Sequence, residues 1–406
     1  MRSICKLGSD LAADCPANHQ SAFVVCRHCT NAEFQRSIEV AAMADGIPGL
    51  ALLGSGIFAS SQYIPKLGEL GGIVSLNTIW SRSEDGAKKA LQLAKSYAPN
   101  AEAKWGQEGL ESILQDKSIH AVAVVLPAQH QLEIVLRALE AGKHVIQEKP
   151  VGPSVADVRS AWSAYQALAK NDTKLPIWAV AENYRFEPAL IQAGKFVKEL
   201  GQIMGVQVLI EAPMNSSSPY FSSSWRREAN FKGGFMLDGG VHFIAGLRMI
   251  MGCEVDSVSA TVSHVDLTLP PPDNLSALIQ LQNGTAGVVY ICYSAKSRKM
   301  IWRVVGSLGT VEVDRTVQNG QHGYKTTYQP AKGEIQEVFC PFAGVYEELR
   351  AFSEDVARCV FQGQSGEEAD KRSSVLEAMR DVAVIEAMFH SSDSKGAPSV
   401  VELELE

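Results

Sequence analysis

The sequence lacks long hydrophobic runs and an excess of positive charge. No apolar stretch approaches the roughly 20 residues that a membrane-spanning helix needs, and the start of the chain contains Asp10 and Asp14 rather than an apolar signal segment. Lysine and arginine number 37 against 45 aspartates and glutamates, a formal net charge of -8. This balance argues against nucleic acid as the main partner. We therefore expect a cytoplasmic protein that binds neither a membrane nor nucleic acid.

Cysteine is too sparse for a disulfide framework, because the eight cysteines are scattered over 406 residues. The apolar neighbours of Cys292 and Cys359 are typical of plain buried thiols. The stretch Cys26–Cys29 has the C-x-x-C spacing of half a zinc site, but no second pair of ligands accompanies it. A complete site would need one of the other amino-terminal candidates to fold back, namely Cys5, Cys15 or His19. We predict no metal.

Length and a hydrophobic content of 46% indicate a globular protein of two domains. Residues 1–46 show no strand-turn-helix pattern, and we interpret them as a leader of unknown role. Between residues 47 and 182, expected strands alternate with expected helices. The strands are expected at 50–53, 73–80, 121–126, 145–146 and 177–181, and the helices at 60–70, 85–98, 132–141 and 155–170. This alternation predicts a doubly wound parallel sheet, a Rossmann domain.

After residue 182 strands follow one another instead of alternating with helices. They are expected at 205–211, 257–267, 276–281, 286–292, 301–305 and 309–313, with helices at 188–200, 242–251, 346–359 and 373–389. Period-2 alternation and the connector Asn283-Gly284 favour an antiparallel or mixed sheet with one face covered by helices. The fold class is therefore α/β, with residues 183–406 as an α+β domain around a large, mostly antiparallel sheet.

A glycine turn joins the first expected strand to the first helix. Gly54, Gly56 and Ala59 form G-x-G-x-x-A, in which glycines permit a tight turn and let the backbone approach a pyrophosphate at the helix start. The alternative is an ordinary glycine turn, but the flanking strand and helix favour a dinucleotide site. The cofactor contacts expected here are Gly54, Ser55, Gly56, Ile57 and Phe58.

The end of the second strand carries Ser81, Arg82 and Ser83, where NAD enzymes usually have an acidic residue. A guanidinium with two hydroxyls suits a 2'-phosphate, and one charge-assisted hydrogen bond would favour NADP over NAD by roughly 10- to 150-fold. The alternative is a solvated Arg82 paired with Glu84 or Asp85. We predict NADP as the preferred cofactor, with NAD as the alternative.

Four segments together resemble the Gfo/Idh/MocA (glucose-fructose oxidoreductase-like) dehydrogenases. They are GSGIFA, AVVLPAQHQLEIVLRALEAGKHVIQEKP, ENYRFEPAL and GGFMLDGGVHFIAGL, and the match in order and spacing covers residues 50–400. The resemblance implies a Rossmann domain followed by a substrate-binding domain with an open-faced sheet. It also implies an enzyme that transfers hydride between nicotinamide and CH-OH or C=O groups of a small molecule, and a homodimer or homotetramer that associates through the sheet.

The resemblance places Lys149 of the E-K-P segment between nicotinamide and substrate, with Glu148 near the cofactor. Carbonyl reduction needs a proton on oxygen, and a positioned ammonium both stabilises the alkoxide and delivers that proton. The alternative is a lysine that binds the carbonyls at strand ends. The resemblance also places Pro127 and Gln129 on the nicotinamide-ribose side of the cofactor.

The resemblance also implies a role for Asp238 and His242. The two residues share one helix face if their segment is helical. His242 would relay the proton or bind the substrate oxygen, and Asp238 would orient it or bind a second hydroxyl. The alternative is Asp238 as a helix N-cap with His242 in the core. Many relatives carry another Asp three residues after this His, where this chain has Ala245.

Weaker substrate-binding candidates follow from position. Asn183, Tyr184 and Arg185 follow the last Rossmann strand, where the crevice of such a sheet lies. Trp225 and Arg226 would clamp an anionic or ring-shaped substrate, or lie in a solvated loop.

The resulting hypothesis is an NADP-preferring oxidoreductase of a sugar, polyol or related cyclic molecule, with Lys149 as acid/base aided by His242 and Asp238. Two alternatives stay open. One is a reductase of a non-sugar enone, imine or tetrapyrrole, and the other is a non-catalytic NAD(P)-sensing regulatory protein.

Overall fold

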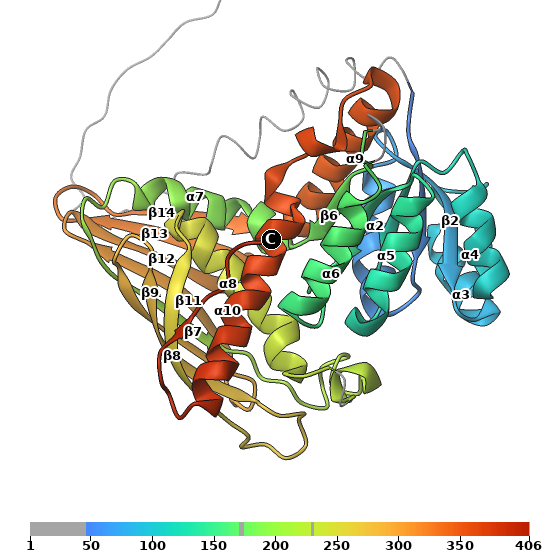
Figure 1. Cartoon of the computed structure of the whole chain (residues 1–406). Helices are drawn as coiled ribbons and strands as arrows, with labels where there is room; N and C mark the ends of the chain where they lie inside the picture. The colour runs from blue at the N-terminus through green and yellow to red at the C-terminus, as the bar shows by residue number, and fades with distance from the viewer. Residues whose placement is uncertain (1–45, 170–173, 229–230, 406) are drawn as a thin grey trace, which may run out of the picture.

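The computed structural model describes residues 46–169, 174–228 and 231–405 as two α/β halves, each built on one sheet. Figure 1 shows the halves side by side, with the amino-terminal sheet and its helices on the right and the larger carboxy-terminal sheet on the left. The expected leader and the Cys26–Cys29 pattern lie outside the described residues.

The amino-terminal sheet is entirely parallel, with strand order β3-β2-β1-β4-β5-β6, so the predicted Rossmann sheet is confirmed. Its strands are β1 (Gly49–Leu53), β2 (Ser75–Ser81), β3 (Glu102–Trp105), β4 (Ala121–Val124), β5 (His144–Glu148) and β6 (Trp178–Ala181). Its helices are α2 (Ile64–Glu69), α3 (Glu84–Ala94), α4 (Gly106–Gln115), α5 (Gln131–Glu140) and α6 (Val155–Gln166), with a short turn of helix η2 (Ala128–His130). Strands β1, β4 and β6 are buried along their whole length, which explains their continuous apolar runs.

The helix after the glycine turn differs from its prediction. A π-helical segment, η1 (Ala59–Tyr63), precedes α2, and Pro65 lies in the first turn of α2. Proline is tolerated there because its missing N–H costs no internal hydrogen bond. Sequence analysis also missed β3, a four-residue strand whose residues are all at least partly exposed, and α4, although α4 buries Leu110, Ile113 and Leu114 on one face.

The carboxy-terminal sheet has nine strands in the order β14-β13-β12-β11-β7-β10-β9-β8-β15. Strands β7 and β10 run parallel and the other neighbours antiparallel, which confirms the mostly antiparallel prediction. The strands are β7 (Ile203–Glu211), β8 (Val255–Ser263), β9 (Asn274–Leu281), β10 (Ala286–Cys292), β11 (Lys299–Gly306), β12 (Gly309–Gln318), β13 (Gln321–Pro330), β14 (Gln336–Pro341) and β15 (Ser399–Val400). Sequence analysis had not predicted β13, β14 or β15.

Helices cover one face of this sheet, the face that looks toward the Rossmann half (Figure 1). They are α7 (Pro188–Val197), α8 (Gly234–Met251) and α10 (Val375–Asp393), and the other helical segments are α9 (Gly344–Gln362), η3 (Asn183–Phe186), η4 (Ser224–Arg227), η5 (Gly366–Glu368) and η6 (Lys371–Ser373). Helix α9 packs on the other half, because Leu349 and Phe352 share a core with Leu50 and Ile79. Helix α9, from the carboxy-terminal part of the chain, therefore contributes to the core of the Rossmann half.

Three further sequence predictions concern the described residues. Cys292 is buried and Cys359 is half-buried, and burial raises the pKa of the Cys359 thiol to about 11. Within the described ranges, no group of three His, Cys, Asp or Glu side chains is placed to hold a metal ion. Among the same residues, none of the helices has both the length and the hydrophobicity needed to cross a membrane.

Candidate active site

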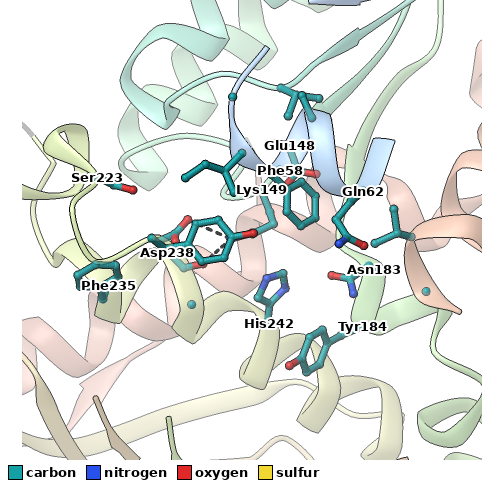
Figure 2. A pocket seen from close by; sticks show the side chains of 18 of the residues that line it. Phe58, Gln62, Glu148, Lys149, Asn183, Tyr184, Ser223, Phe235, Asp238 and His242 are labelled. Atoms are coloured by element: carbon teal, nitrogen blue, oxygen red, sulfur yellow. Dashed lines mark hydrogen bonds and ion pairs between the residues drawn. The ribbon is translucent and has the colours of Figure 1, made fainter. Parts of the chain in front are cut away.

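A cleft of about 750 Å³ lies where the carboxyl ends of the Rossmann strands face helix α8. Figure 2 shows Lys149 between Glu148 and Asp238, with His242 close by and Tyr184 beside His242. The carboxyl ends of parallel strands are where open α/β sheets bind ligands. The cleft therefore combines the Rossmann crevice with side chains from the second half of the chain.

The glycine turn lines one end of the cleft and has the shape that a dinucleotide needs. Gly54 has φ +138°, and a Cβ on it would lie 2.2 Å from the carbonyl oxygen of Val125, so only glycine fits. A Cβ on Gly56 would meet nothing within 4 Å, because Gly56 faces open space. All five residues expected from the turn line the cleft: Gly54, Ser55, Gly56, Ile57 and Phe58. A pyrophosphate can approach this backbone at the helix start.

The end of β2 presents Ser81 and Arg82 to the same cleft. The Ser55 hydroxyl donates to the Ser81 hydroxyl at 2.8 Å. Ser83 does not line the cleft; it caps α3, accepting a hydrogen bond from the amide of Gly86 at 3.2 Å. Arg82 is exposed, as its alternative expected, but no ion pair joins it to its acidic neighbours among the described residues. Glu84 pairs with Lys88 and Asp85 with Lys89, one helical turn on in each case.

Lys149 is held by Asp238. Its Nζ donates to the Asp238 carbonyl oxygen at 2.9 Å and to Oδ1 at 3.0 Å, while Oδ2 of Asp238 accepts from Nε of Arg226 at 2.8 Å. Burial opposes ionisation of Asp238, but Arg226 and Lys149 outweigh it and hold the pKa of this carboxyl well below its usual range. The alternative for Lys149 was a lysine that binds backbone carbonyls near the ends of strands. Lys143 is such a lysine, since it donates to the carbonyls of Asp116 and Ile119.

His242 is oriented by Glu182 rather than by Asp238. Its Nδ1 lies 2.7 Å from Oε1 of Glu182, which also accepts from the amide of Tyr184 at 3.1 Å, and the Tyr184 ring stacks on the imidazole at 4.7 Å. Burial opposes ionisation of Glu182, but His242 holds the pKa of this carboxyl below its usual value. With Nδ1 engaged, Nε2 is the ring nitrogen left for a ligand in the cleft.

The N-cap alternative for Asp238 is also wrong, since α8 starts at Gly234 and Asp238 lies inside it. Asp238 and His242 do share a helix face, and both line the cleft. Glu182 was missed by sequence analysis. Its signal was its place directly after β6, at the carboxyl end of a Rossmann strand.

Two residues expected near the nicotinamide ribose have different surroundings. Pro127 lines the cleft, whereas Gln129 does not; its amide donates to the Trp225 carbonyl oxygen at 2.8 Å and ties the two halves together. Glu148 lines the cleft and accepts a hydrogen bond from the hydroxyl of Tyr63 at 2.8 Å. Burial raises the pKa of Glu148 to about 7, although Lys149 and the Tyr63 hydrogen bond act in the opposite direction.

The substrate-binding candidates separate into two groups. Asn183, Tyr184, Trp225 and Arg226 line the cleft. Arg226 is not in a solvated loop, because its guanidinium lies 4.0 Å from the centre of the Trp225 ring and binds Asp238. The prediction that Arg185 binds substrate is wrong, because Arg185 does not line the cleft.

Arg185 is buried and points away from the cleft, toward α10. Its guanidinium pairs with Asp381 at 2.7 Å and with Glu377 at 2.9 Å. A buried cation needs such partners, so the residue two places after Asn183 stabilises the fold instead of meeting substrate. Ala245, which stands where many relatives have an Asp, lies in α8 and is fully buried.

Two family models match the chain. One is described as the NAD-binding Rossmann fold of the oxidoreductase family and covers residues 49–174, and the other is its C-terminal alpha/beta domain and covers residues 195–403. A dehydrogenase of Fusarium mangiferae named FPY6 is 29% identical over 374 residues, which are 88% of this chain and 99% of the relative. Levoglucosan dehydrogenase of Pseudarthrobacter phenanthrenivorans is 27% identical over 249 residues, 60% of each chain.

Solved structures show the same architecture. An oxidoreductase of Thermotoga maritima superposes with a TM-score of 0.72 and 26% identity, covering 87% of this chain and 98% of the other. A levoglucosan dehydrogenase in complex with NADH and L-sorbose has a TM-score of 0.69 at 20% identity, with 88% and 99% covered. The glycine turn, the cleft at the strand ends and both domain matches lead to one conclusion: the chain belongs to the Gfo/Idh/MocA family of NAD(P)-binding oxidoreductases.

Proposed function

We propose that this protein is an NADP-preferring dehydrogenase or reductase of a sugar, polyol or related cyclic molecule. The observation that carries the proposal is the meeting of two buried pairs, Lys149 with Asp238 and His242 with Glu182, in the cleft that holds the glycine turn. The relatives named for acting on levoglucosan and on a deoxysugar nucleotide support the substrate class.

The chain's own groups would handle the proton and the substrate. A nicotinamide cofactor whose pyrophosphate is held at the glycine turn would supply or accept the hydride. Lys149 Nζ, fixed by Asp238, donates a proton to the substrate oxygen in reduction and stabilises negative charge that develops there. His242 Nε2 binds the same oxygen or exchanges the proton with Lys149, and Glu182 stabilises the ring when it is charged.

Replacing Arg82 with alanine should weaken NADPH binding by roughly 10- to 150-fold, the loss expected for one charge-assisted hydrogen bond, and leave NADH binding unchanged. The measurement is a fluorescence titration of the full chain with each nucleotide. Lys88→Ala is the matched control, because Lys88 is an exposed cation six residues away that pairs with Glu84. Failure of the wild type to bind either nucleotide would overturn the proposed function, and equal loss of both in Arg82→Ala would overturn the NADP preference.

Glu182→Gln should lower kcat by roughly 10- to 100-fold, because a neutral amide replaces the carboxylate that binds and orients the His242 ring. Glu187→Gln is the control, since Glu187 is another buried cleft carboxyl but accepts from the amide of Ala343 instead of a histidine. An unchanged kcat in Glu182→Gln would contradict the assigned role.

A non-sugar enone or imine is the second candidate substrate, and aromatic lining favours it. Tyr220, Trp225 and Phe235 form one apolar stretch of the cleft around Arg226. A carbonyl panel that includes a flat, hydroxyl-free enone beside aldoses separates the two classes by kcat/KM.

We also propose a cytoplasmic homodimer or homotetramer that associates through the helix-free face of the large sheet. This face exposes Leu278 and Val288, on adjacent strands β9 and β10. Light scattering of wild type and Leu278→Lys tests the association.

A further inference from the structure

The lining of the cleft extends past His242 to residues that the hydride-transfer chemistry does not use. Its wall is the helix-facing side of the large sheet, where Met300, Arg315 and Tyr324 lie on adjacent strands β11, β12 and β13. Phe342, just after β14, completes this wall. Arg315 has the same strand parity as Val311 and Val313, which are buried on the helix-covered face.

Arg315 lines the cleft and has no carboxylate partner within 4.0 Å among the described residues. Arg185, Arg226 and Arg248 each bind at least one carboxylate. Arg315 instead donates weakly to the sulfur of Met300 at 3.6 Å and lies 4.8 Å from the centre of the Phe342 ring. A partly desolvated guanidinium that stacks on an aromatic ring can still donate hydrogen bonds from its N–H groups to an anion.

The acidic groups nearest in sequence or space are already engaged. Asp314 has the opposite strand parity and pairs with Lys299 at 2.9 Å. Glu187 accepts from the amide of Ala343 at 3.2 Å, and burial raises the pKa of Glu187 to about 7. A second guanidinium adds positive charge, since burial and the neighbouring Arg315 together lower the pKa of Arg298.

A continuous row of rings joins Arg315 to the relay histidine. The Tyr184 ring stacks on His242 at 4.7 Å and lies 6.0 Å from Tyr324, which lies 5.1 Å from Phe342, the ring under Arg315. A substrate that reaches along this row would place one end at Lys149 and His242 and the other at Arg315.

We propose that Arg315 is a specificity-determining residue that binds an anionic group, a carboxylate or a phosphate, carried by the substrate away from its reacting carbon. The inference rests on the proposed function and narrows it to acidic or phosphorylated polyhydroxy compounds. A planar guanidinium binds either group through paired hydrogen bonds.

The test is a ligand-observed NMR titration of the full chain saturated with NADP⁺. The probes are glucose, glucuronate and glucose 6-phosphate, which share a ring and differ in charge. The variants are Arg315→Ala, Arg315→Lys and the control Arg303→Ala, which removes an exposed guanidinium with the opposite strand orientation. We expect an anionic probe to bind wild type and Arg303→Ala roughly 10- to 100-fold more tightly than glucose. Arg315→Ala should lose this preference, and Arg315→Lys should keep part of it.

Several outcomes would overturn the inference. They are an equal affinity of wild type for all three probes, no binding of either anion, or an anionic preference that survives in Arg315→Ala. The two anions distinguish a carboxylate subsite from a phosphate subsite. NADPH titration of each variant separates this inference from the proposed function, because normal nucleotide binding without charge preference removes only the role of Arg315. Thermal melts identify a variant that fails to fold, in which case Arg315→Lys gives the answer.

Discussion

Replacing Lys149 with methionine is expected to lower kcat/KM by roughly 10²- to 10⁴-fold, the usual contribution of a positioned general acid. Methionine keeps much of the side chain's length and apolar volume but removes the ammonium that Asp238 holds at 3.0 Å. Arg226 remains as a partner for Asp238, so the carboxylate is not left unpaired. NADPH binding should persist, because the glycine turn and Arg82 are untouched. The measurement is NADPH oxidation with any carbonyl compound that wild type reduces, together with the nucleotide titration.

Lys143→Met is the matched control for this experiment. Lys143 and Lys149 flank the same strand, β5. Lys143 is buried, but its ammonium binds the carbonyls of Asp116 and Ile119. The control should lose stability with little change in kcat. A Lys149→Met enzyme with wild-type kcat/KM would remove Lys149 from the chemistry and would make the two lysines equivalent structural residues.

Asp381→Ala is expected to cause the largest loss of stability, about 3–5 kcal/mol, as is usual when one member of a buried ion pair is removed. Asp381 is 1% exposed and binds two buried guanidiniums, Arg185 at 2.7 Å and Arg248 at 2.6 Å. Alanine would leave both cations short of a counter-charge in the interface between η3, α8 and α10. Thermal and urea unfolding, followed by circular dichroism, measure the effect.

Two comparisons make this result interpretable. Asp381→Asn keeps one hydrogen-bond acceptor without the charge and should be intermediate. Asp85→Ala breaks an ion pair with Lys89 whose side chains are both mostly exposed, and it should cost less than about 1 kcal/mol. If Asp381→Ala unfolded at the same urea concentration as Asp85→Ala, the buried cluster would not be what holds α10 in place.

The cofactor half of the site follows from local sequence. The glycine turn lies between a buried strand and a helix, and the residues that bind a dinucleotide are neighbours along the chain. All five strands expected in the Rossmann half share most of their residues with observed strands, namely β1, β2, β4, β5 and β6, because apolar runs mark strands that are buried in such a sheet. The polar strand β3 was missed because it lacks that pattern.

The pairing of the residues proposed to handle the proton could be found only in the folded structure. Asp238 and His242 are four residues apart, so their common helix face was predictable, but their partners were not. The partner of His242, Glu182, lies 60 residues before it, and Asp238 binds Lys149 across 89 residues. Arg185 lies in the same short segment as Asn183 and Tyr184, yet its partner Asp381 is 196 residues away and takes it out of the cleft.

The sequence by itself determined the α/β architecture and the glycine turn, because periodicity and turn chemistry are local properties of the chain, and its resemblance to the family singled out Lys149 and His242 as candidates. The tertiary structure alone decided which buried charges pair: Glu182 with His242, Asp381 with Arg185, and no carboxylate among the described residues with Arg315. The physical reason is that a buried charge is stable only beside a counter-charge or a ligand, and packing brings these together from distant segments.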